Sequence, residues 1–111
     1  MLRLAELEPE FIKIIDERSH RPCELSEADG LFFLCPVCFT KNGGPVGTHG
    51  IILWRPHVPK ERSPKAGRWE FVGTGIEDLS LVAGSSSILL VTGPSGCGAH
   101  FFIRNGGVDL A

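Results

Sequence analysis

Two pairs of metal-binding residue types stand out in this chain of 111 residues: Cys35-Pro-Val-Cys38 and Cys97-Gly-Ala-His100. In each pair two residues separate the ligands, and a tight turn with this spacing aims both side chains at one point. Zinc binds four such ligands at the corners of a tetrahedron, with zinc–sulfur bonds of about 2.3 Å. The sequence therefore predicts one Cys3His zinc site. Its four protein ligands make it structural, because a catalytic zinc keeps a position for water or substrate.

Alternatives remain open at this site. Cys35-Pro-Val-Cys38 alone would also suit thiol–disulfide chemistry, but the second pair favours a metal, and thiolates accept iron as well as zinc. His49 follows a glycine-rich turn, where it is a further ligand, a residue that contacts a ligand, or an ordinary turn histidine. Cys23 lies in a polar segment and is expected to be an ordinary thiol. A Cys97/His100 nucleophile pair is not favoured, since metal binding uses both groups and no nearby carboxylate orients the histidine.

One segment imitates a nucleotide-binding motif. The string SILLVTGPSGCG at 87–98 has the strand and the two glycines of a phosphate-binding loop. Ala99 and His100 stand where that motif needs a lysine and then a serine or threonine. We therefore expect no nucleotide binding. The chain also lacks the His-x-Glu pattern of zinc deaminases.

The composition predicts the kind of fold that must position these residues. Hydrophobic residues make up 42% of the chain and charged residues 22%, with a formal net charge of −2, which describes one soluble domain over residues 1–111. Gly 14 and Pro 8 favour turns and short strands over long helices. We expect a mostly β fold, α+β at most: a small zinc-ribbon-like domain of short antiparallel strands, with a possible short N-terminal helix. Structural zinc would replace part of a small core.

The apolar patterns place the elements. Core strands are predicted over 31–34, 51–54 and 87–92, and an alternating strand over 69–72. Residues 76–81 form a turn or strand, and Asn105-Gly106 closes a C-terminal hairpin. Residues 4–17 suit a helix and a strand equally. The longest apolar stretch, 31–39, is too short to span a membrane and the N-terminus is acidic, so we expect a cytoplasmic protein that is not secreted.

Charge divides the chain unevenly. Residues 1–30 form an acidic segment, which precedes the expected zinc-stabilised β core at 31–111. Residues 55–68, between two tryptophans, contain three prolines and five basic residues against one glutamate, which predicts an exposed loop. This basic loop is the candidate partner-binding surface. Its basic residues are Arg55, Lys60, Arg62, Lys65 and Arg68.

The strings EADGLFFLCPVCFTKNGGPVGTHGIILW, GRWEFVGTGIEDLSL and GCGAHFFIRNGGV resemble a family of small phage and prophage proteins. The resemblance spans roughly three-quarters of the chain, residues 27–108. The family is known as a domain of unknown function. Some members are named ammonia monooxygenase, which nothing in these residues supports, and related domains accompany bacterial ubiquitin-like conjugation operons. The resemblance implies a closing turn at Asn105-Gly106 and a departure at Ala99, where members often have an aromatic residue. It implies these metal ligands: Cys35, Cys38, Cys97 and His100.

These observations favour a non-enzymatic role. We expect a structural-zinc protein that acts as an interaction module for a phage or host protein in the bacterial cell. One alternative is a zinc-dependent hydrolase with an open coordination position near His49. A second alternative is a nucleic-acid-binding zinc ribbon that uses the basic loop, which the net negative charge does not favour. No membrane or nucleotide partner is expected.

Overall fold

The fold is mostly β, as the composition predicts. The structure, a computed structural model, describes residues 2–16, 19–58, 68–82, 88–90 and 100–110. Within these ranges ten short strands form three antiparallel sheets, accompanied by one α-helix and three 3-10 turns. Five residues singled out above lie outside the described ranges: Lys60, Arg62, Lys65, Cys97 and Ala99.

The sheet that positions the first cysteine pair has the strand order β3-β2-β4-β5. Its strands are β2 (Glu10–Ile14), β3 (His20–Pro22), β4 (Gly30–Leu34) and β5 (Gly50–Trp54). The two faces of β4 are buried to different extents. Leu31 and Phe33 are fully buried in the main core, whereas Phe32, between them, packs with Ile12 and Trp54 on the other face. This alternation fixes the register in which β4 pairs with β5.

The second sheet has the order β1-β10-β9-β8 and contains the C-terminal hairpin. Its strands are β1 (Leu2–Arg3), β8 (Ile88–Leu90), β9 (His100–Arg104) and β10 (Gly107–Leu110). Asn105 and Gly106 join β9 to β10 with φ angles of 49° and 74°. An Asn-Gly pair tolerates these left-handed angles, so the predicted closing turn is confirmed.

The third sheet pairs β6 (Glu70–Val72) with β7 (Ser80–Val82). The 3-10 turn η3 (Ile76–Asp78) lies between these strands. The Asp78 carboxylate accepts hydrogen bonds from the amides of Thr74 and Gly75, each at 2.9 Å from Oδ1. These bonds lower the pKa of Asp78, and the bond from the Thr74 amide has the largest effect. The loop between β6 and β7 is thereby held in one conformation.

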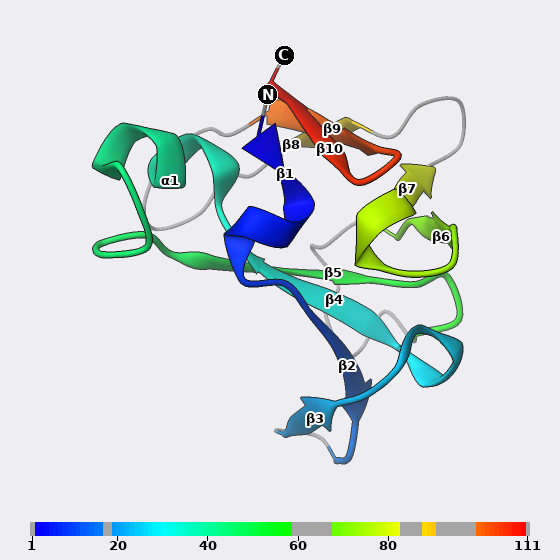
Figure 1. Cartoon of the computed structure of the whole chain (residues 1–111). Helices are drawn as coiled ribbons and strands as arrows, with labels where there is room; N and C mark the ends of the chain where they lie inside the picture. Colours follow the sequence, from blue (N-terminus) through cyan, green and yellow to red (C-terminus); the bar gives the residue numbers. More distant parts are fainter. Residues whose placement is uncertain (1, 17–18, 59–67, 83–87, 91–99, 111) are drawn as a thin grey trace.

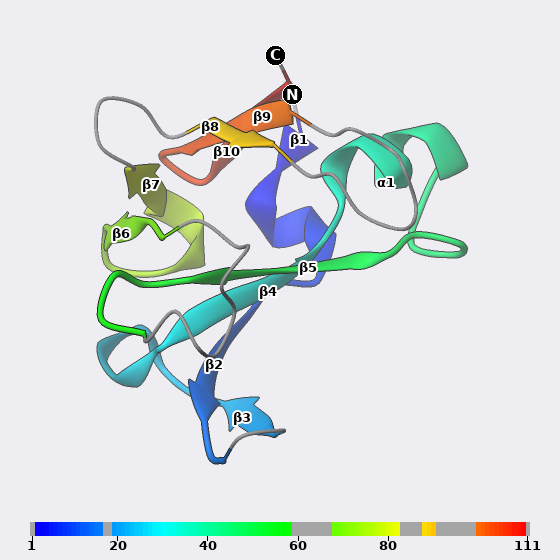
Figure 2. The same cartoon turned by 180° about the vertical axis from the view of Figure 1, so that it is seen from behind.

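The main core lies between the first two sheets. Figures 1 and 2 show the β8–β9–β10 sheet on one side of the molecule and the long β4–β5 pair on the other. The 3-10 turn η1 (Leu4–Leu7) fills the space between them, and both of its leucines are fully buried. Phe33 meets Phe101 of β9 edge to face, with ring centroids 6.0 Å apart. The acidic N-terminal segment thus supplies part of the core that the sequence placed at residues 31–111.

The structure decides one segment that the sequence left open and contains one helix that the sequence did not predict. Residues 4–14 contain η1 and β2, so the segment that suited either a helix or a strand holds a 3-10 turn and a strand. The α-helix of the described chain is α1 (Pro36–Asn42), where a tight turn and loop were expected. Pro36 occupies its first turn, where a missing N–H costs nothing, and Gly43 ends it with a φ of 70°. Leu25–Glu27 form the short 3-10 turn η2.

Candidate metal centre

Three side chains of metal-ligand type meet at the junction of β4, α1 and β5. One ligand atom from each of Cys35, Cys38 and His49 lies within 4.8 Å of the other two. A zinc tetrahedron, with bonds of about 2.3 Å to sulfur and 2.0 Å to nitrogen, separates its ligand atoms by roughly 3.5–3.8 Å. The three atoms are therefore within a small side-chain adjustment of that geometry. Together they can hold one metal ion.

The start of α1 positions the two cysteines. Cys35 is the N-cap residue, and its carbonyl accepts the first helical hydrogen bond from the Phe39 amide at 2.8 Å. Cys38 follows three residues later, and a spacing of three brings two side chains to the same face of a helix. Cys35 is fully buried and belongs to the main core cluster, while Cys38 is half-buried at its edge. The two cysteine side chains therefore lie close together because they belong to one helical turn.

His49 is held by the β4–β5 ladder. Leu34 pairs with Gly50, and the Cys35 amide then donates a hydrogen bond of 2.9 Å to the His49 carbonyl. This bond ties the backbones of two ligand residues together. The preceding loop is closed by Thr48, whose hydroxyl donates to the Gly44 carbonyl at 2.8 Å. His49 therefore faces the cysteines because of strand register.

This register is the signal that places His49 near the two cysteines. The two apolar runs at 31–34 and 51–54 were both predicted as strands, and a hairpin between them places residue 35 opposite residue 49. The spacing of ligands along the chain contains no such information. Pairing the runs antiparallel before searching for ligands would have placed His49 beside Cys35.

The second predicted ligand pair is described in part. Cys97 lies outside the described residues, and His100 is described as the first backbone position of β9, without its side chain. The adjacent Phe101 packs against Phe33, two residues before Cys35. The start of β9 therefore lies in the part of the core that contains the end of β4.

Cys23 does not belong to this cluster. It is half-buried beside the main core, and its amide donates to the Phe11 carbonyl at 3.0 Å. Burial raises the pKa of the Cys23 thiol, and the nearby carboxylate of Glu27 raises it further. A raised pKa reduces the thiolate fraction at neutral pH and with it the nucleophilicity.

The two described arginines of the basic loop contact the protein itself. The Arg68 Nε donates to the Val58 carbonyl at 3.0 Å, and Val58 is buried. The Arg55 guanidinium lies 5.5 Å from the centroid of the Phe71 ring and faces backbone carbonyls of residues 25 and 28. Both described ends of the predicted exposed loop thus contact the protein, and its middle, residues 59–67, lies outside the described residues.

A carboxylate meets a histidine near the start of the basic loop. The Asp29 Oδ1 lies 2.7 Å from the His57 Nε2, and its Oδ2 accepts a bond of 2.8 Å from the Ile14 amide. Partial burial acts to raise the pKa of Asp29, but the bonds from His57 and Ile14 outweigh it, so the pKa is lowered. Because it ties β2 to the end of β5, we regard this pair as structural.

Comparison of the chain with protein-family models, curated proteins and solved structures finds no match. In the described part of the chain, no helix has the length and apolar character needed to cross a membrane.

Proposed function

We propose that this protein binds one zinc ion at Cys35, Cys38 and His49, and that the metal is structural. The clustering of these three ligand atoms within 4.8 Å is the observation that supports the proposal. Two thiolates and an imidazole are donors that zinc accepts readily, in a tetrahedral set that a fourth ligand completes. His49 thus joins the ligand set that the sequence suggested.

The fourth ligand comes from the second sequence pair, Cys97 or His100. Two contacts support this assignment. Phe101, the neighbour of His100, packs on Phe33, and Cys35 shares one core cluster with both rings. A metal held in this way would connect α1 and the β4–β5 pair to the sheet that contains β9. The connection matters in a domain of this size because binding energy at a structural zinc adds to the folding energy.

In this proposal the zinc-stabilised domain acts as a protein-interaction module of a small phage or prophage protein. We propose a phage or prophage origin because the chain resembles that family over residues 27–108. A fully buried cysteine at the site supports a structural metal over a catalytic one, because a reactive zinc has to meet solvent and substrate. The partner is a phage or host protein.

Metal content tests the ligand set. Mass spectrometry of the purified wild type should find one zinc per chain. The variants Cys35→Ser, Cys38→Ser and His49→Ala should lose it, together with one of Cys97→Ser and His100→Ala. His20→Ala is the matched control, since His20 is exposed on β3. A wild type without metal, or a His49→Ala variant with full zinc content, contradicts the proposal.

The coordination number separates this proposal from the hydrolase alternative. The three ligands within 4.8 Å match the number that a catalytic zinc takes from its protein. After cobalt substitution, the visible absorption spectrum should show four protein ligands and should not change when small anions are added. A spectrum that responds to anions would indicate an exchangeable position and would favour the hydrolase.

A further inference from the structure

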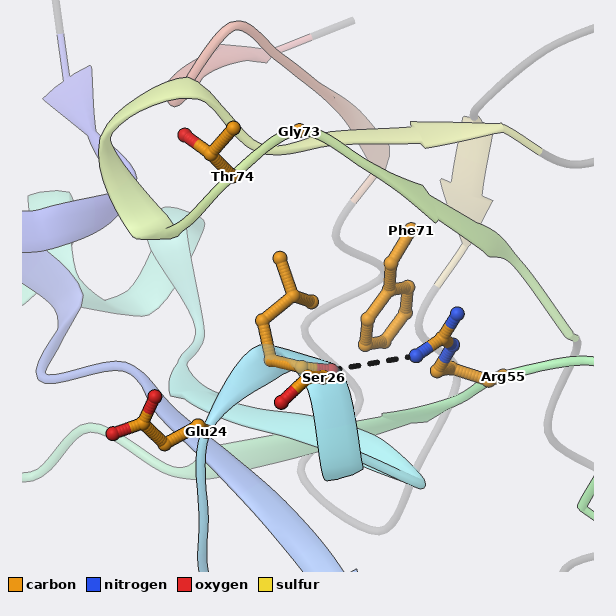
Figure 3. Close-up of a pocket in the computed structure, with 7 residues that line it drawn as sticks. Glu24, Ser26, Arg55, Phe71, Gly73 and Thr74 are labelled. Atoms are coloured by element: carbon orange, nitrogen blue, oxygen red, sulfur yellow. Dashed lines mark hydrogen bonds between the residues drawn. The ribbon is translucent and has the colours of Figure 1, made fainter.

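A pocket of about 480 Å³ lies at the opposite end of β5 from the cysteine cluster. Ligand sites of proteins have volumes of about 300–1,000 Å³, so a small molecule fits here. The wall is formed by the turn η2, the end of β5 and the loop that follows β6 (Figure 3). The lining residues are Glu24, Leu25, Ser26, Arg55, Phe71, Gly73 and Thr74.

Arg55 is the cation of this lining, and its guanidinium is weakly satisfied. Its Nη1 faces the carbonyls of Leu25 and Ala28 at 3.4 Å each, well beyond the usual 2.9–3.0 Å. Its Nη2 lies 3.9 Å from the Glu70 carboxylate, whose side chain is 58% exposed. Among the described residues the buried Nε has no hydrogen-bond partner. A donor left in this state gains from any acceptor that reaches it.

The guanidinium is nevertheless held in place. The Phe71 ring lies against it at 5.5 Å, and the long bonds to the turn η2 limit its rotation (Figure 3). An arginine whose plane is fixed loses little entropy when it binds an anion, and its fork of donors matches the two oxygens of a carboxylate. The hydroxyl groups of Ser26 and Thr74 line the same pocket.

Charge selects among anions. Figure 3 shows the Glu24 carboxylate directed away from Arg55, on the far side of the pocket. The Glu70 carboxylate lies 3.9 Å from the Arg55 Nη2. Together with Arg55 the two carboxylates give this region a net negative charge, which repels a phosphate dianion more strongly than a singly charged group. Phe71 and Leu25 add an apolar contact to a lining that is mostly polar, which suits a small ligand with one apolar group.

We propose that this pocket binds a small carboxylate-bearing molecule, with the carboxylate against Arg55 and its apolar part against Phe71 and Leu25. The proposal is independent of the metal. His49 precedes β5 and Arg55 follows it, so the two sites lie at opposite ends of that strand.

Benzoate is the probe, and benzamide, which has the same shape without the charge, is its control. Amide signals of Gly73 and Thr74 in the ¹⁵N NMR spectrum should shift saturably with benzoate at constant ionic strength. Benzamide should bind at least about tenfold more weakly, because a hydrogen bond to a charged group exceeds a neutral one by that factor or more. Equal affinity for the two compounds, or tighter binding of inorganic phosphate, overturns the proposal.

Two substitutions assign the effect to Arg55. Arg55→Gln should abolish benzoate binding. Arg104→Gln should not, although Arg104 also lies over a ring, that of Phe102, at 4.5 Å. Glu70→Gln should bind benzoate several-fold more tightly, because it removes the carboxylate that competes for the guanidinium. A merely structural role for Arg55 predicts no such gain, so unchanged or weaker binding by Glu70→Gln counts against the proposal.

Discussion

Replacing Phe33 should damage the contact between the two sheets that brings β9 toward the cysteine cluster. The Phe33 side chain is 0% exposed, and its ring meets Phe101 edge to face. Truncation of a buried phenylalanine to alanine costs about 3–5 kcal/mol, and the aromatic pair itself accounts for roughly 0.5–1.5 kcal/mol. Against a total stability of about 5–15 kcal/mol, Phe33→Ala should therefore leave a marginally folded domain.

Phe32→Ala is the matched control, because it removes the same ring from the adjacent position of β4. Phe32 is half-buried on the other face of the sheet, where it packs with Trp54. The fraction of the ring that leaves water on folding is smaller there, so the free energy of unfolding should fall by less than half as much.

Urea unfolding followed by tryptophan fluorescence measures both costs, since Trp54 and Trp69 are buried. Each variant is compared with the wild type with added zinc and again with a chelator, so that loss of packing and loss of metal are separated. The comparison requires an unchanged slope of free energy against urea concentration. A Phe33→Ala cost below about 1.5 kcal/mol, or one no larger than that of Phe32→Ala, would refute the packing argument, since buried rings cost twice that or more.

Three further predictions concern the turn, the ion pair and the metal. Gly106→Ala should destabilise the fold by roughly 2–4 kcal/mol, because a Cβ there adds left-handed backbone strain and collides with the Glu77 carbonyl. A Cβ at Gly43 would have no neighbour within 4 Å, so Gly43→Ala should cost about 1 kcal/mol from backbone strain alone. Urea unfolding measures both costs. The lowered pKa of Asp29 stabilises the fold above the unfolded value of about 4, and this contribution is lost as pH falls through the folded pKa. In unfolding measured from pH 7 down to pH 3, Asp29→Asn should therefore be less stable than the wild type at pH 7, and the difference should narrow as the pH falls below about 4; a difference that stays constant would contradict the assignment. Chelation of the metal should lower the melting temperature reversibly, by an amount that grows with the free zinc concentration of the reference sample.

The strands could be predicted where apolar residues mark a buried strand or where turn residues mark a hairpin. Leu31 and Phe33 mark β4 by their apolar run, and Asn105-Gly106 marks the hairpin by its backbone angles. The helix α1 was missed because its seven residues show no apolar periodicity, and its ends depend on a proline and a glycine that also indicate turns. Strand β3 was missed because all its residues are exposed, so the sequence shows no apolar alternation there. It forms because its backbone pairs with β2.

The candidate site was also predictable only in part. Ligand type and spacing indicated Cys35 and Cys38 as a pair, and their proximity follows from one helical turn. His49 joins them through a strand register that spacing does not contain. The sequence indicated Arg55 as a candidate binding residue but gave no sign of the pocket beside it, because the other walls come from residues 24–26, 71, 73 and 74, which are far apart along the chain.

The geometry of β5 allows the role of the metal to be tested by way of the pocket. His49 and Arg55 are separated by six residues of extended chain, about 20 Å, and substitutions that far apart act independently unless they unfold the protein. If zinc is structural, its removal at a temperature between the melting temperatures of the metal-free and the zinc-bound protein should abolish benzoate binding at Arg55 together with the fold. If zinc is merely bound at a folded site, the metal-free protein should bind benzoate as the wild type does. Because the pocket reports on the fold without contacting the metal ligands, it distinguishes a metal that builds the domain from one that the domain only carries.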